Sequence, residues 1–287
     1  MAAPPSAHYE TVSTAFQVLD IADPLVTTAA PDWTVADVTM AITQGSIEHP
    51  ENFFAIVRDG KVIHGYFALD SDADSQANAA QACIPILADQ IVPGSLPLLE
   101  LIPLFEQHYF FFVLTRNDLT HVVSFLDLSK LPIQLCLFAL LTGLEAELIR
   151  LLLQWPHAID VFLSRLPENR QRSAREWAHT RYGEKQVTPE RILRATSFMD
   201  KITMFLHESS FVAALPFDTQ DQAQEFFKEL HEIRNRIAHS QPILEHLHTP
   251  VMFNSFLSRL RHVTDAISRL ASQPLDDGFG KPSPTTS

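Results

Sequence analysis

The chain has few cysteines and few glycines. Only two of its 287 residues are cysteine, Cys83 and Cys136, which excludes a disulfide framework and a four-cysteine zinc site. Its eight glycines form neither of the common glycine-rich loops, because no P-loop and no G-x-S-x-G motif is present. The sequence therefore does not support the protein classes that these two loops define.

The sequence also lacks a long uncharged apolar run. Its longest apolar stretch, residues 131–153, is interrupted by one amide and three charged side chains (Gln134, Glu145, Glu147 and Arg150). This pattern predicts a buried helix and no membrane span. The first ten residues have neither a basic segment nor an apolar one, so we predict no signal peptide, no membrane partner and a cytoplasmic location.

Positive charge is scarce in the first half. The net charge is −13, and residues 1–132 hold four basic residues against 16 acidic ones. This excess argues against a protein that coats nucleic acid, and we expect no DNA partner. The densest basic stretch, residues 165–194, has eight bases and four acids. It is compatible with a solvated helix pair or with a local track for phosphates. The shift in charge predicts a domain boundary near residue 130.

The pattern of apolar residues predicts a duplicated unit followed by helices. A strand, a helix and a hairpin are expected at 16–22, 32–43 and 53–69, with Asp32 as the helix N-cap. The same order is expected again at 83–87, 93–105 and 109–128, which gives a repeat of about 55 residues. From Ser129 onward the periodicity is helical. Helices are expected at 131–153, 166–181, 189–207, 219–239 and 251–271. The polar tail, residues 273–287, is expected to be disordered.

The duplicated unit resembles a tandem pair of cystathionine-β-synthase (CBS) domains. The resemblance covers about residues 12–130 and depends mainly on HVVSFLDLSKLP, which is similar to the family's closing strand and turn. It implies an adenine nucleotide as a regulatory ligand, with Ser124 and Asp127 holding the ribose. Two departures stand out: His121 occupies the family's usual glycine position, and Ala68 occupies the hydroxyl position in the first copy. Asp127 is also compatible with a simple turn-capping role.

A second motif lies in KELHEIRNRIAHSQP, which contains Arg234, Asn235 and His239 near a helix end. The same R-N-x-x-x-H string occurs at 116–121, but across an expected β-turn. At 100° per residue, Arg234 falls inside the apolar stripe of its helix, where a buried guanidinium requires a partner. It either extends to solvent or is held by an acid or a bound anion. Glu145, which also interrupts an apolar face, is a candidate partner.

The second half resembles the HEPN superfamily of dimerising helical bundles with an R-x4–6-H motif. The resemblance covers residues 131–272, and many members are metal-independent ribonucleases. It implies that His239 acts as acid or base, that Arg234 stabilises the phosphorane and that Asn235 orients His239 or the phosphate. Glu145 completes the expected catalytic set. The superfamily also contains non-catalytic dimerisers.

Together these observations predict an α+β protein: a CBS-like α/β pair followed by an all-α HEPN-like bundle. The expected function is a nucleotide-regulated, metal-independent endoribonuclease that acts on RNA as a homodimer. The alternative is a non-catalytic adenine-nucleotide sensor or dimeric scaffold with a protein partner. The His pair in EHLHTP lies in an expected loop with no nearby cysteine, so we predict no metal site.

Overall fold

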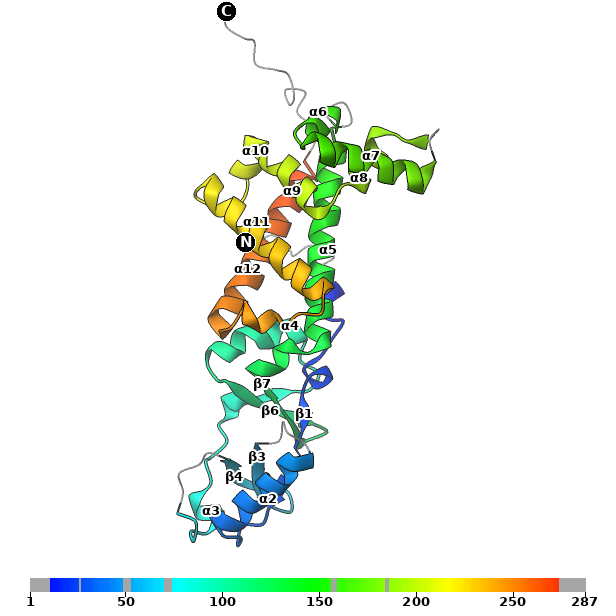
Figure 1. The fold of residues 1–287 in the computed structure, drawn as a ribbon. Helices are drawn as coiled ribbons and strands as arrows, with labels where there is room; N and C mark the ends of the chain where they lie inside the picture. The colour runs from blue at the N-terminus through cyan, green and yellow to red at the C-terminus, as the bar shows by residue number, and fades with distance from the viewer. Residues whose placement is uncertain are drawn as a thin grey trace, which may run out of the picture. The chain divides into compact units, whose positions relative to one another are not determined.

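The computed structural model describes residues 11–25, 27–48, 53–69, 74–155, 159–183 and 186–273. The chain forms two compact units. The N-terminal unit comprises residues 13–134 and 247–251, and the helical unit comprises 1–12, 135–246 and 252–287 (Figure 1). The predicted α+β class is confirmed, because every strand described lies in the first unit. Apart from Gln273, the expected disordered tail lies outside the described residues.

The N-terminal unit contains two sheets built to the same plan. In the first, β2 (Thr27–Ala29) pairs in parallel with β3 (Phe54–Asp59), which forms a hairpin with β4 (Val62–Ala68). In the second, β5 (Ile91–Pro93) pairs in parallel with β6 (Phe110–Thr115), which forms a hairpin with β7 (Asp118–Ser124). A short extra strand, β1 (Asp23–Pro24), pairs with β7. The order strand, helix, hairpin is therefore present twice, as the sequence predicts.

The two hairpins are equivalent in detail. Each has a register shift at the same position, between Val57 and Arg58 in the first and between Val113 and Leu114 in the second. Phe54 pairs with Ala68, and Phe110 pairs with Ser124. Ala68 and Ser124 are thus equivalent positions, as the comparison of the two copies in the sequence predicts.

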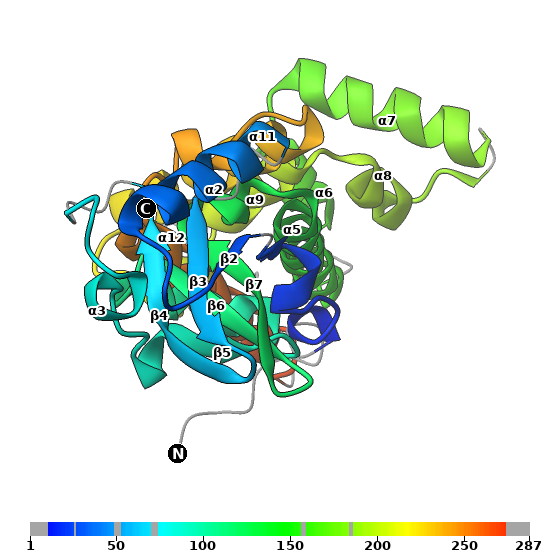
Figure 2. The same ribbon diagram turned by 90° about the horizontal axis from the view of Figure 1, so that it is seen from below.

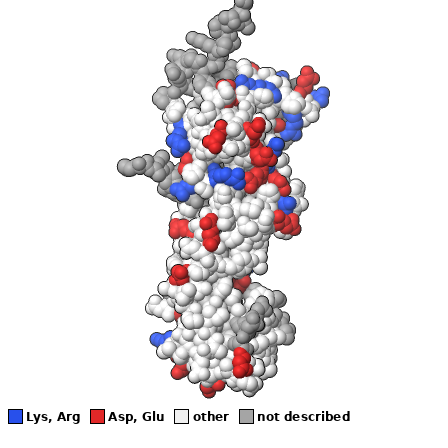
Figure 3. Space-filling view, turned by 90° about the vertical axis from the view of Figure 1, so that its left-hand side faces the viewer, with Lys and Arg blue, Asp and Glu red and all other residues white. Residues whose placement is uncertain are grey.

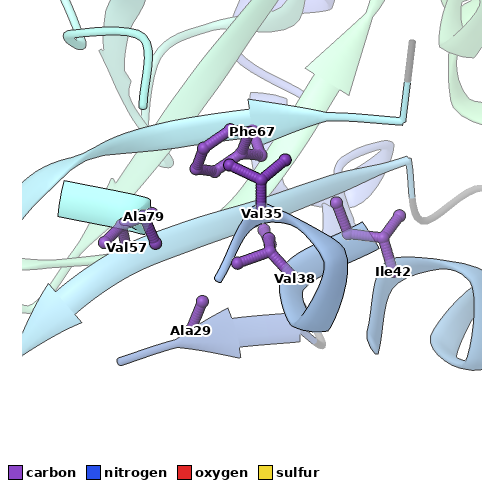
Figure 4. Close-up of a cluster of buried hydrophobic side chains, with 8 residues drawn as sticks. Ala29, Val35, Val38, Ile42, Val57, Phe67 and Ala79 are labelled. Carbon is purple, nitrogen blue, oxygen red and sulfur yellow. The ribbon is translucent and has the colours of Figure 1, made fainter. Parts of the chain in front are cut away.

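Helix α2 (Val35–Glu48) covers the first sheet (Figure 4). Its Val35, Val38 and Ile42 pack against strand residues in a buried cluster. The members of this cluster are Ala29, Val35, Val38, Ile42, Ala55, Val57, Phe67 and Ala79. The helix begins at Thr34, which makes reciprocal hydrogen bonds with Asp37. The N-cap is therefore Thr34, and the prediction of Asp32 was wrong.

Both predicted first strands were placed wrongly. Residues 18–20 form a 3₁₀ turn, and Ile84 makes only an isolated bridge to Tyr66. The true strands, β2 and β5, have three residues each and are too short to show a periodicity. The short helix α3 (Ala79–Ala82) packs on the first sheet through Ala79. The other short helical elements of the unit are η1 (Val18–Asp20), η2 (Ala88–Gln90), α4 (Leu98–Leu101), η3 (Ile102–Glu106) and η4 (Phe125–Ser129).

The helical unit begins in the long helix α5 (Leu131–Leu153), as predicted. The other helices described are α6 (Ile159–Ser164), α7 (Glu168–Tyr182), α8 (Pro189–Ala195), α9 (Phe198–Leu206), α10 (Ser209–Ala213), α11 (Gln220–Ala238), the 3₁₀ turn η7 (Ile243–Glu245) and α12 (Pro250–Leu270). The helix predicted at 189–207 is two helices, because Ser197 caps a new one with Asp200. The short helices α6 and α10 were not predicted. Helices α7 and α8 lie side by side (Figure 2).

The core of the helical unit is aromatic. Phe205 of α9 packs on Phe227 of α11, and Phe226 of α11 packs on Phe256 of α12. Helix α5 joins this core through polar contacts as well, because Arg150 donates hydrogen bonds to Ser268 of α12. In the described part of the chain, no helix is both long enough and apolar enough to cross a bilayer.

Candidate functional site

Helix α11 carries the R-N-x-x-x-H motif and is amphipathic. Thr219 caps its first turn by accepting a hydrogen bond from the backbone of Gln222. Its apolar stripe is buried as predicted at five positions (Ala223, Phe226, Phe227, Leu230 and Ile233). Ile237 is half-buried and Ala238 is exposed, so the stripe ends one turn earlier than the wheel predicts. The final turn, which carries the motif, therefore lies at the edge of the core.

A Schellman motif ends this helix and places His239. The Ser240 N–H donates to the Ile237 carbonyl, and the Gln241 N–H donates to the Arg236 carbonyl. Ser240 adopts a left-handed conformation (φ 53°), which is the usual geometry one residue beyond the C-cap. His239 is the C-cap, and its side chain is exposed. The imidazole is thus available to a solvent-borne substrate.

Arg234 differs from the other basic residues around it. Its side chain is half-buried, and its guanidinium makes no hydrogen bond or ion pair with the residues that the structure describes. Arg236, two positions later, binds both Glu232 and Glu245. Arg259 binds Glu229. Arg234 therefore keeps its donors free for a ligand, whereas its neighbours use theirs in structural ion pairs.

Asn235 contacts His231, one turn earlier on the same helix. Asn235 Nδ2 lies 3.0 Å from His231 Nε2. Burial lowers the pKa of His231, and the positive charge of Arg234 lowers it further. The buried Nδ1 of this ring has no hydrogen-bond partner among the described residues. Asn235 therefore orients His231 in this chain, which differs from its expected contact with His239.

Glu145 is not the partner of Arg234. Its Oε1 lies 2.9 Å from Nζ of Lys201 on α9, and Lys201 is only 1% exposed. The Lys201 ammonium also donates to the Thr196 carbonyl. The structure thus places the predicted carboxylate in a largely buried ion pair of the core. Of the four predicted catalytic residues, Arg234, Asn235 and His239 lie together at one helix end, and Glu145 has a partner elsewhere.

The predicted ribose-binding pair forms a closed cluster in the N-terminal unit. Asp127 Oδ2 accepts hydrogen bonds from the backbone N–H (2.6 Å) and the hydroxyl (2.9 Å) of Ser124. Asp127 Oδ1 lies 2.9 Å from Lys130 Nζ, which also binds Asp23 at 2.5 Å and the Ile21 carbonyl. Asp127 is therefore a turn cap here, as the simpler interpretation of the sequence held. A ribose would have to displace one of these partners.

The pKa of Lys130 reflects the same cluster. Burial alone would lower the pKa of this ammonium, but its bonds to Asp23 and Asp127 raise the pKa above its usual value. Lys130 therefore remains charged and holds both carboxylates. In the first copy, Ala68 offers no hydroxyl, and Asp70, the next acid along the sequence, lies outside the described residues.

The glycine position differs between the copies for a steric reason. A Cβ on Gly65 would lie 2.4 Å from the Ile84 carbonyl oxygen, so the bridge to Tyr66 requires glycine there. The equivalent His121 in the second copy instead pairs with Pro24 of β1. Burial lowers the pKa of His121.

No described group of three or more His, Cys, Asp or Glu side chains could hold a metal ion. Both histidines of EHLHTP follow η7, with His246 as its C-cap. His246 faces Glu229 and Glu232 at 3.8 and 3.5 Å, and His248 is exposed. His246, but not His248, thus belongs to the group of charged side chains around Arg236.

Two residues that contact predicted site residues were not identified from the sequence: His231, which contacts Asn235, and Lys201, which contacts Glu145. His231 is four positions before Asn235, which is the spacing of helical neighbours. Lys201 has Phe198, Met204 and Phe205 at helical spacing. Lys201 therefore interrupts an apolar helix face as Glu145 does, and this pattern in the sequence indicates a buried charge at both positions.

The end of α11 brings three basic side chains together: Arg234, His239 and His231. It offers a free guanidinium, an accessible imidazole and a second imidazole with a lowered pKa. A scan against protein-family models and a search of curated proteins gave no match to this chain.

Proposed function

We propose that the helical unit is a metal-independent endoribonuclease of the HEPN type, regulated by an adenine nucleotide at a CBS-like N-terminal unit. The observation that carries this proposal is the guanidinium of Arg234, which is half-buried and makes no hydrogen bond or ion pair with the described residues. Its donors are therefore open to an anion. It lies on the final turn before an accessible histidine, which is the arrangement that anion binding and proton transfer require.

In the proposed reaction, His239 removes the proton from a ribose 2′-hydroxyl or supplies the proton to the departing oxygen. The 2′-oxygen attacks the adjacent phosphorus, and the bond from phosphorus to the 5′-oxygen breaks. Arg234 stabilises the charge that develops on the phosphoryl oxygens. The products are a 2′,3′-cyclic phosphate and a 5′-hydroxyl. A single motif supplies one imidazole at the helix end, so a second copy across a dimer would supply the other.

The surface of α5 supports a dimer. Leu135 and Phe138 lie one turn apart on this helix and are 45% and 42% exposed. Large apolar side chains that remain exposed at helical spacing are typical of a helix–helix contact. The proposed homodimer would bury them.

The alternative is a non-catalytic dimeric scaffold or nucleotide sensor. One observation favours it: Asn235 bonds to His231, so nothing described on α11 orients His239. The excess of acidic residues in the first half of the chain also fits a protein partner better than RNA.

Cleavage of an end-labelled single-stranded RNA in EDTA separates the two functions. We expect wild type to cut the RNA and His239→Ala to lose cutting by at least about 100-fold, the usual scale of acid–base catalysis. His248→Ala is the matched control, because His248 is exposed on the loop before α12. It should cut as wild type does.

A second pair of variants tests the arginine. Arg234→Ala should abolish cutting, while Arg236→Ala, which removes two ion pairs and a hydrogen bond to the Pro242 carbonyl, should retain it. The assay is repeated with adenine nucleotides, and a change in rate that disappears in Asp127→Ala would support regulation. Equal cutting by His239→Ala and wild type, or no cutting under any condition, would reject the ribonuclease in favour of the scaffold.

A further inference from the structure

A pocket of about 630 Å³ lies where the two hairpin tips of the N-terminal unit meet. The tips are the two-residue turns Gly60–Lys61 and Arg116–Asn117, each closed by a strand pair. This tip pocket is lined by both tips and by the segment before β5. Its volume is within the range of about 300–1,000 Å³ that is usual for small-molecule sites. It lies at the opposite end of the hairpins from Ser124 and Asp127.

Basic side chains are concentrated in the tip pocket. The first 132 residues contain four lysines and arginines, and three of them line it: Arg58, Lys61 and Arg116. In a segment with 16 acidic residues, this concentration creates a local positive site. Figure 3 shows few basic side chains on the visible face of the N-terminal unit. The pocket therefore attracts an anion that the rest of the unit repels.

One of these cations is held in place and two are free. The Arg58 guanidinium binds both carboxylate oxygens of Asp118 at 3.1–3.3 Å and donates to the Gly60 carbonyl. Lys61 and Arg116 are exposed and make no hydrogen bond or ion pair with the described residues. The ion pair joins the two hairpins and fixes the pocket, while the free cations remain available to a ligand.

Arg116 occupies a backbone position that disfavours a side chain of its size. Arg116 and Asn117 both have positive φ, 49° and 67°. A turn with this geometry favours Asn-Gly, and arginine is strained at its first position. The equivalent residue of the other tip is Gly60 (φ 55°). The second copy thus has arginine where the first has an unstrained glycine.

The tip pocket also has an apolar wall, and three polar residues (His64, Asn117 and Asp118) are part of the lining. The wall is formed by Ile63, Ile86, Ile91, Leu114 and Leu119. A site with an apolar wall and free cations selects a ligand that has both an apolar body and an anionic group. From this geometry we infer that the tip pocket binds a small organic phosphate, whose phosphate contacts Lys61 and Arg116 and whose apolar body packs on the isoleucines and leucines. This site is separate from the proposed ribose and RNA sites.

Calorimetric titration of the full-length protein with phenyl phosphate tests the inference, with inorganic phosphate and phenol as separate probes. Phenyl phosphate should bind at least about tenfold more tightly than either fragment, because it uses both parts of the pocket. Lys61→Ala and Arg116→Asn should each weaken binding about tenfold, the scale of one charge-assisted hydrogen bond. Asparagine suits the left-handed turn, so Arg116→Asn should remain folded.

Two controls locate the binding. Arg172→Ala removes an exposed cation of α7 in the helical unit and should leave phenyl phosphate affinity unchanged, as should Ser124→Ala at the proposed ribose site. The inference is overturned if inorganic phosphate binds as tightly as phenyl phosphate, or if the Lys61→Ala, Arg116→Asn double variant binds as wild type does. Binding that Arg172→Ala or Ser124→Ala weakens equally would overturn it too. RNA cleavage does not enter this experiment, so its result is independent of the proposed ribonuclease.

Discussion

Lys201 is an ammonium group at the centre of the helical core, with Glu145 as its charged partner. Removing the carboxylate would leave the charge buried with only the Thr196 carbonyl beside it. A fully buried pair broken in this way costs ~3–5 kcal/mol. Glu145 is partly exposed, so water replaces some of the lost interaction. Breaking this ion pair therefore tests whether Glu145 contributes to stability or to the proposed reaction.

We therefore predict that Glu145→Ala lowers the free energy of unfolding by about 2 kcal/mol. In the Lys201→Met background the same substitution should cost much less, because no buried charge is left behind. Urea unfolding of the four proteins of this double-mutant cycle measures both effects. Unchanged stability in Glu145→Ala together with lost RNA cleavage would instead assign Glu145 to the reaction.

His231 predicts a dependence of stability on pH. Burial and the charge of Arg234 hold its pKa below the ordinary value of 6.5. Between that lowered pKa and 6.5 the unfolded chain binds more protons than the folded chain does, so stability rises with pH in this window. It is fully present above 6.5 and is lost as the pH falls toward the lowered pKa.

Urea midpoints measured at several pH values between 5 and 7.5 test this. Wild type should lose stability below pH 6.5, and His231→Gln should lose less over the same range. His121, whose pKa is also lowered by burial, should account for part of the remaining slope. Parallel curves for wild type and His231→Gln would show that His231 titrates normally.

At the scale of elements, the end of α11 contains a residue, Ser240, whose backbone strain a glycine would relieve. Ser240 has a φ of 53°, a conformation that glycine adopts without a Cβ penalty. Ser240→Gly should therefore stabilise the protein by about 0.5–1 kcal/mol. RNA cleavage should persist, since the Schellman hydrogen bonds that position His239 use only the backbone. A lower urea midpoint would show that the Ser240 side chain itself contributes to this helix end.

The long helices were predictable because many residues share one periodicity. Helices α5, α11 and α12 begin and end within two residues of the predicted positions. Strands β2 and β5 were not predictable, because three residues show no alternation and because distant residues determine how these strands pair. The break between α8 and α9 depends on the reciprocal bonds of Ser197 and Asp200, a local signal within a continuous apolar pattern.

The part of the candidate site that lies on one helix was predictable, because helical spacing determines which of its side chains are neighbours. The helical wheel places Arg234 at an apolar stripe, and in the structure it is half-buried and has no hydrogen-bond or ion-pair partner among the described residues. The bond between Asn235 and His231 follows from their spacing. By contrast, the pairing of Glu145 with Lys201 joins residues 56 positions apart. The tip pocket likewise requires two hairpins to meet, which periodicity along one segment does not indicate.

At the scale of the whole molecule, the proposed dimer gives the clearest expectation. Phe138→Glu places a charge on the exposed face of α5 and should convert a dimer to a monomer. Light scattering after size-exclusion chromatography measures the mass, and circular dichroism checks that the helices are retained. Met40→Glu, at an exposed apolar position on α2, is the control and should remain dimeric. A monomeric wild type, or a dimeric Phe138→Glu, would reject this face as the interface.

Lys130 brings the two ends of the duplicated unit together. Its ammonium binds the Ile21 carbonyl, Asp23 and Asp127, so the first and last segments of the duplicated unit meet at one amino group. A module whose entry and exit points adjoin can be inserted into a host chain without stretching it. Because its two ends lie close together, the duplicated unit could be inserted into another protein, or removed from this one, as a single segment.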